Sequence, residues 1–99
     1  MNTWYAAKLL FESSVDDGSK ESPLLEESTR VLLADSVETA EAKALAIGHA
    51  AEHSYLNESG QSVKWAFVSI LELQDLCETE LLDGTEVFSR LYRRDSGDA

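Results

Sequence analysis

Residues 35–51 read DSVETAEAKALAIGHAA and contain the one segment of this chain with a clear helical pattern. Asp35 or Ser36 can accept the free backbone N–H groups of a first helical turn. Most side chains on the apolar face are small, and Gly48 lies beside them, so the pattern predicts a helix that approaches a sheet closely. The apolar positions recur three or four residues apart: Val37, Ala40, Ala44, Ile47 and Ala51.

Two strands are expected before this helix. Residues 4–11 alternate, with Tyr5, Ala7, Leu9 and Phe11 on one side of an extended chain. A second strand is expected over about 27–34. Its centre, residues 31–33, is apolar on both sides and predicts a place inside the sheet rather than at its edge. The polar stretch of about 13–25 between the two strands predicts an exposed loop.

Further strands are expected after the helix. A turn is predicted at residues 57–60, followed by a long strand over about 62–73 that puts Val63, Trp65 and Phe67 on one side. Val68 and Ile70 then continue on the other side, and a bulge near Ser69 would reconcile the two patterns.

The remainder of the chain is less uniform in pattern. Residues 71–82 fit a short helical turn as well as extended structure, and both interpretations stay open. Asp83-Gly84 predicts a turn. The alternation over 85–93 then predicts a last strand, and residues of about 94–99 predict a frayed tail.

Together these elements predict a single α+β domain over residues 1–99. Its order is ββαβββ, with an antiparallel sheet of about four to five strands and one main helix packed on one face. One helix leaves the other face of the sheet uncovered, and large apolar patches are uncommon on monomers. We therefore expect a homodimer. The candidate interface residues on that face are Trp4, Leu10, Leu32, Phe88 and Tyr92.

Composition limits the class of protein. The chain has 19 acidic and 8 basic residues and a net charge of −11, which repels phosphate backbones and disfavours nucleic-acid binding. The same charge favours a basic protein partner. No apolar run is long enough to span a membrane. The single cysteine, Cys77, and an N-terminus without signal-peptide features predict a cytoplasmic location.

No catalytic constellation stands out. Cys77 lies beside Glu78, and acidic neighbours do not activate a thiol. His49 and His53 are four apart on the expected helix and are the candidates for a metal site, but two ligands are fewer than zinc requires. The sequence therefore predicts no catalytic residue, no metal and no cofactor, and it favours a non-enzymatic domain.

A ligand site is a separate possibility. Tyr55, Asn57, Trp65 and Glu86 are candidates to line a pocket between the helix and the sheet. Core packing is an alternative role for Trp65, because large aromatic side chains supply much of a small core.

Several blocks of sequence, taken together, resemble one bacterial family. They are residues 4–12 (WYAAKLLFE), the helix with Ala40, Lys43, Ala44, Ile47 and Gly48, residues 55–60, residues 63–68 (VKWAFV) and residues 83–89 (DGTEVFS). The family is catalogued as domain of unknown function 4288, and the similarity runs from Trp4 to Leu91. The resemblance implies a compact standalone cytoplasmic domain and brings no activity, substrate or catalytic residue.

Two functions follow as expectations. The first is a non-enzymatic, self-associating protein-interaction domain with an acidic surface, of which an immunity-type antagonist that masks a basic toxin is one version. The alternative is a small-molecule-binding domain or small enzyme that uses the pocket between helix and sheet.

Overall fold

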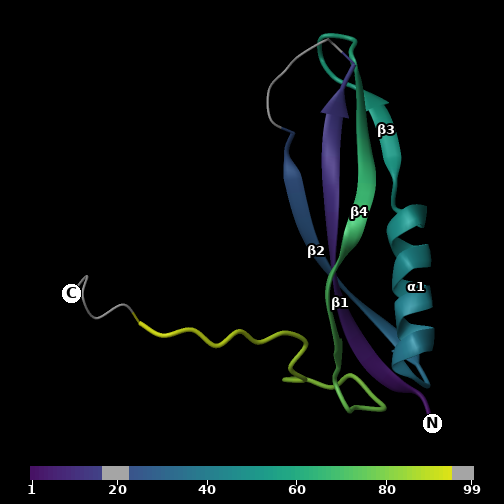
Figure 1. Cartoon of the computed structure of the whole chain (residues 1–99), viewed down its shortest axis with the longest axis vertical. Helices are drawn as coiled ribbons and strands as arrows, with labels where there is room; N and C mark the ends of the chain where they lie inside the picture. Colours follow the sequence, from purple (N-terminus) through teal and green to yellow (C-terminus); the bar gives the residue numbers. More distant parts are fainter. Residues whose placement is uncertain (17–22, 95–99) are drawn as a thin grey trace.

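The computed structural model describes residues 1–16 and 23–94 and shows one four-stranded antiparallel sheet with one long helix against it (Figure 1). The elements are β1 (Thr3–Val15), β2 (Leu25–Ala34), α1 (Val37–Ala50), β3 (His53–Leu56) and β4 (Ser62–Asp75). The strand order in the sheet is β2-β1-β4-β3. The α+β class and the single helix on one face are therefore confirmed.

The number and order of strands differ from the prediction. The order is ββαββ, and residues 85–93 form no strand. The chain leaves the sheet after β4, at Cys77, whose φ is 59°. β1 has a strand on each side, whereas β4 pairs with β3 only from Ser62 to Trp65. Residues 85–93 leave the sheet and pair with none of its edges, and alternation alone does not make a strand without a neighbour for its hydrogen bonds.

The long strand β1 is the centre of the sheet. It pairs with β2 from Thr3–Ala34 to Glu12–Leu25 and with β4 from Tyr5–Asp75 to Val15–Val63. Residues 13–15 thus belong to the strand, which shortens the loop predicted over 13–25. The part of that loop at 17–22, like the predicted tail at 95–99, lies outside the described residues.

The position predicted for the second strand is wrong, because β2 is at an edge of the sheet. The reason lies in the last residues of the strand. Leu32 and Ala34 are buried in the core that includes the helix, while Val31 and Leu33 lie on the opposite side. A strand can be apolar on both faces at one end and still have no neighbour on its outer side.

Irregularities in β4 explain the mixed pattern of its sequence. The pairing with β1 shifts register between Leu10 and Phe11 and again between Lys8 and Leu9. Val68 and Leu71 are the residues left without a partner. The expected bulge near Ser69 is confirmed, and it returns Ile70 and Leu73 to the core side, where Trp65 and Phe67 already lie. Of the ambiguous stretch 71–82, residues 71–75 are strand.

The helix begins and packs as its sequence predicts. The Ser36 hydroxyl accepts the Thr39 backbone N–H at 3.1 Å and caps the first turn. Ala40, Ala44 and Gly48 are buried, and Val37 is the one residue of the predicted stripe that stays exposed. At fourteen residues, α1 is too short to cross a bilayer, and no other helix among the described residues could do so.

The core lies between α1 and the facing side of the sheet. Tyr5, Ala7, Leu9 and Phe11 of β1 form its centre, as the alternation predicts. Burial raises the pKa of the Tyr5 hydroxyl, and the negative charge of Asp75 adds to that effect. The Phe67 ring packs edge-on against Phe11, with ring centroids 5.8 Å apart.

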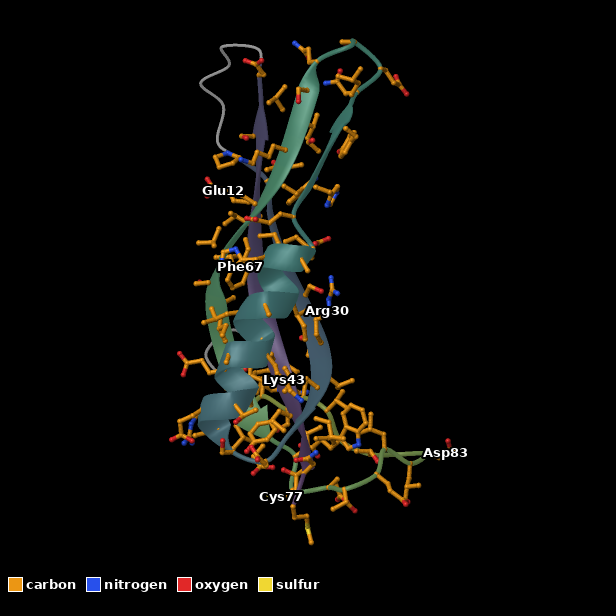
Figure 2. All side chains as sticks on the ribbon, turned by 90° about the vertical axis from the view of Figure 1, so that its right-hand side faces the viewer. Glu12, Arg30, Lys43, Phe67, Cys77 and Asp83 are labelled. Atoms are coloured by element: carbon orange, nitrogen blue, oxygen red, sulfur yellow. The ribbon has the colours of Figure 1, made fainter. Side chains whose placement is uncertain are left out.

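Glycine is required where the helix meets β4. A Cβ on Gly48 would lie 2.5 Å from Cδ1 of Phe67, closer than any real Cβ contact. The Phe67 ring is held in place by Phe11 on one side and by His49, whose ring centroid is 5.0 Å away, on another. Figure 2 shows Phe67 behind the helix.

Replacement of Gly48 by alanine is expected to lower the free energy of unfolding by about 1 kcal/mol. Overpacking a well-packed core costs about 1–3 kcal/mol, and the better helix propensity of alanine returns about 1 kcal/mol. Urea denaturation measures the difference. Ala46→Gly, at an exposed position of the same helix, is the control for propensity alone.

A second variant tests the cause. In a Phe67→Leu background the penalty of Gly48→Ala should shrink, because leucine lacks the rigid ring and can rotate away. A penalty that is the same in both backgrounds would show that the ring is not what excludes a side chain at position 48.

Candidate functional site

The side of the sheet that faces away from α1, which we call the second face, has no covering helix in the described part of the chain. In β1 it consists of Trp4, Ala6, Lys8, Leu10 and Glu12, since these alternate with the core residues. Trp4 and Leu10 are partly exposed there. Their partners in β2 are Leu33 and Glu27. Two of the five predicted interface residues therefore lie where they were expected.

Leu32 does not belong to this surface. It pairs with Tyr5, so its side chain shares the helix side of the sheet, and only 5% of it is exposed. The assignment of Leu32 to the second face is wrong, because three apolar residues in a row conceal which of them faces the helix.

The segment after β4 first continues along Trp4 in the plane of the sheet and then reaches the second face. The Trp4 backbone N–H donates to the Glu78 carbonyl at 2.7 Å, and the Leu76 N–H donates to the Trp4 carbonyl at 2.9 Å. Further along, Lys8 Nζ lies 4.2 Å from the centroid of the Phe88 ring. Phe88 is thus in contact with a residue of its own chain on the second face.

Tyr92, the last predicted interface residue, extends away from the sheet. Its side chain is 79% exposed, and the Arg90 guanidinium lies 5.1 Å from its ring centroid. Figure 1 shows this yellow segment leaving the lower end of the molecule. The structure therefore brings Trp4, Leu10 and Phe88 to one face and leaves Tyr92 apart.

Charged groups occupy the middle of the second face. Lys8 Nζ is 3.6 Å from Glu27 Oε1 across the β1–β2 ladder. Glu12 and Glu72 belong to the same face by their register. An exposed cross-strand pair of this kind contributes little stability, but it neutralises one of the acids next to the edge of β2. The second face is therefore mixed rather than continuously apolar.

The four predicted ligand-binding residues do not converge. Tyr55 and Trp65 share the core side of the β3–β4 pair by register, and Tyr55 is half-exposed. Asn57 belongs to the turn beyond them. Glu86 belongs to the segment that leaves the sheet at its other end, far from β3 in Figure 1.

The Asn57 side chain has a structural role. Its Oδ1 accepts the Ser59 and Gln61 backbone N–H groups, and its Nδ2 donates to Gln61 Oε1. Gly60, with a φ of 78°, completes the predicted turn. The other predicted turn, at Asp83-Gly84, is also present, with a φ of 87° at Gly84.

The two histidines occupy different elements. The helix ends at Ala50, so only His49 is on it and His53 begins β3; the expectation that both share a helix face is wrong. The His49 ring packs on Phe67, and His53 stacks on Tyr55 with centroids 6.1 Å apart. Within residues 1–16 and 23–94, no three metal-binding side chains come together.

Between the histidines, Glu52 makes a contact that its sequence position does not suggest. Its Oε2 accepts the Phe67 backbone N–H at 2.9 Å. The pairing of β3 with β4 ends at His53–Trp65, so the carboxylate replaces the carbonyl that a longer β3 would offer. This hydrogen bond lowers the pKa of the Glu52 carboxyl, and His49, 3.6 Å away, lowers it further.

A second contact missed from the sequence involves Lys43. Its Nζ donates to the Leu33 carbonyl at 2.6 Å, from the helix to the outer edge of β2. Figure 2 shows Lys43 extending from the helix toward that strand. A lysine on the polar side of a helix is ordinarily read as solvated, so its place ten residues after Leu33 carries no signal by itself.

Comparison with known families identifies the family of this chain. The model of the family described as a domain of unknown function (DUF4288) matches residues 4–89, and the chain belongs to this family. No curated protein and no solved structure shows significant similarity to the chain.

The Glu52 carboxylate should stabilise the fold in a pH-dependent way. Its folded-state pKa lies below the ordinary 4.5, so its contribution is present above pH 4.5 and is lost as the pH falls through the folded-state pKa. Glu52→Gln keeps an acceptor oxygen and removes the charge. Wild type should therefore be more stable than this variant at neutral pH, and the difference should disappear in acid.

Urea denaturation of both proteins across the acid range measures that difference. Glu41→Gln, which changes an exposed glutamate earlier in the helix, is the matched control. A stability difference for Glu52→Gln that stays constant with pH would contradict a role for the charge.

Proposed function

We propose that this chain is a non-enzymatic protein-interaction domain that self-associates through its sheet and offers an acidic surface to a protein partner. A basic protein is the partner that suits this charge, as in an antagonist that masks a basic toxin. A cytoplasmic location accords with its single, exposed cysteine.

The observation that carries the proposal is the amount of exposed surface. The chain exposes 7406 Å², whereas a monomeric protein of 10.9 kDa exposes about 5,600 Å². The radius of gyration is 17.5 Å, against about 13 Å for a compact domain of this length. The surplus of roughly 1,800 Å² includes the extended segment after β4 as well as the uncovered side of the sheet (Figure 1). It leaves room for an interface of about 800 Å² per partner.

Apolar side chains are exposed over part of this surface. One helix covers part of one face of a long sheet, and the second face is covered only at one end. The segment after β4 carries further exposed apolar side chains. Exposed apolar side chains in these regions include Leu25, Val31, Leu82, Leu91 and Tyr92. Surfaces of this kind mark sites of protein association.

A ligand pocket between helix and sheet is less well supported. The Phe67 ring occupies that space under Gly48, and small alanines close the rest of the contact. Tyr55, Trp65 and Glu86 do not surround a common volume. We therefore favour the interaction domain over the small-molecule binder or enzyme.

The chain should sediment as a dimer. Sedimentation velocity over a range of concentrations should give a mass twice the 10.9 kDa of one chain. A monomer at every concentration would contradict self-association.

A basic partner should bind in a salt-dependent way. Products of adjacent genes, titrated one at a time by calorimetry, should include a basic protein whose affinity falls at high salt, because charge attraction is screened. Binding that is insensitive to salt would contradict recognition through the acidic surface.

A further inference from the structure

We propose that two copies of this chain associate through the outer edges of β2, in an antiparallel register centred on Ser28. The result would be one continuous sheet with both helices on the same side. This inference rests on the proposed self-association and specifies the residues that perform it.

The backbone groups that point outward can be assigned from the hydrogen bonds. Leu24 accepts the Ser13 N–H at 2.9 Å, so Leu24 and the even-numbered residues of β2 direct their backbone groups toward β1. The odd-numbered residues, namely 25, 27, 29, 31 and 33, direct theirs outward. The bond from Lys43 to the Leu33 carbonyl agrees with this assignment.

Lys43 also limits the length of the open edge. Because its Nζ occupies the Leu33 carbonyl, the outward groups that remain for another strand are those of Leu25, Glu27, Thr29 and Val31. The Ser28-centred register pairs Leu25 with Val31 of the second copy and Glu27 with Thr29 of the second copy. It uses these four residues and ends where Lys43 begins.

Charge selects the same register. On the helix side, Glu26 then lies directly opposite Arg30 of the second copy, and the twofold axis repeats the pair. A register centred on Glu27 would place two like charges opposite each other, as would one centred on Arg30. A register centred on Thr29 would pair Leu25 with Leu33, whose carbonyl Lys43 occupies. Opposite charges in facing positions stabilise a sheet, and like charges destabilise it.

The remaining side chains fit this arrangement. Glu27 faces the uncharged Thr29 of the second copy, and its own charge is already paired with Lys8 of its own chain. Leu24 and Leu25, which are 70% and 63% exposed, would face Leu32 and Val31 of the second copy. Figure 2 shows Arg30 projecting from the β2 side of the sheet, beside the helix.

A symmetric disulfide tests the register. In a Cys77→Ser background, Ser28→Cys should form a cross-linked dimer under mild oxidation. Facing residues in a non-hydrogen-bonded pair have Cα atoms about 4.5 Å apart, within the range of about 4.4–6.8 Å that disulfides need. Thr29→Cys and Val31→Cys are the matched controls, since both pairs of cysteines would be out of register and should cross-link far less.

Charge reversal is the second test. Glu26→Arg or Arg30→Glu alone should weaken the dimer about tenfold or more, because each places like charges in two facing pairs. The double variant should restore the wild-type dissociation constant. Sedimentation equilibrium gives the constants, and circular dichroism confirms that each variant folds.

The outcomes separate this inference from the proposed function. A wild-type chain that stays monomeric overturns both. A wild-type dimer that ignores the charge reversals and is not cross-linked through position 28 overturns the β2 edge alone and leaves association through the second face. Cross-linking at position 28, with rescue by the double variant, supports the edge in the Ser28 register.

Discussion

The close approach of α1 to β4 at Gly48 is the constraint on which the rest of this structure depends. With no side chain at that position, the helix can lie directly on the Phe67 ring. That contact decides which side of the sheet becomes core. Phe67 has to face the helix, and the shifts in register along β4 then return Ile70 and Leu73 to the same side. Where β3 ends, the Glu52 carboxylate accepts the Phe67 backbone N–H and so adds one more contact to this part of β4.

The same arrangement leaves one side of the sheet without a helix. A single helix fixed on one side of a long sheet leaves the other side to the segment after β4, which reaches Trp4 and Lys8 at one end only. In the described part of the chain, the outer edges of β2 and β3, and that of β4 beyond Trp65, have no neighbouring strand. These uncovered surfaces are what the proposed self-association would bury.

Local patterns allowed much of this fold to be predicted from the sequence. Ser36, the alanine stripe with Gly48, the turns at Gly60 and Gly84 and the alternation of β1 all depend on neighbours within a few residues. The errors concern contacts between distant residues. Residues 85–93 alternate like a strand, yet they leave the sheet and pair with none of its edges. Leu32 and β2 were misplaced because pairing partners cannot be read from one strand. The roles of Glu52 and Lys43 required knowledge of which backbone groups lie at a sheet edge.

At the edge of β2, backbone groups and charged side chains together limit which strand can pair with it. Edge strands are commonly protected from pairing by charges, proline or a covering element, and Lys43 provides that protection at Leu33. Between Leu25 and Val31 only charged side chains protect the edge, namely Glu26, Glu27 and Arg30. Lys8 pairs with Glu27. The remaining two have opposite signs and lie at equal distances from Ser28 along the strand. In the proposed pairing, such an edge would accept its own sequence in one antiparallel register and would disfavour strands that lack the matching charges.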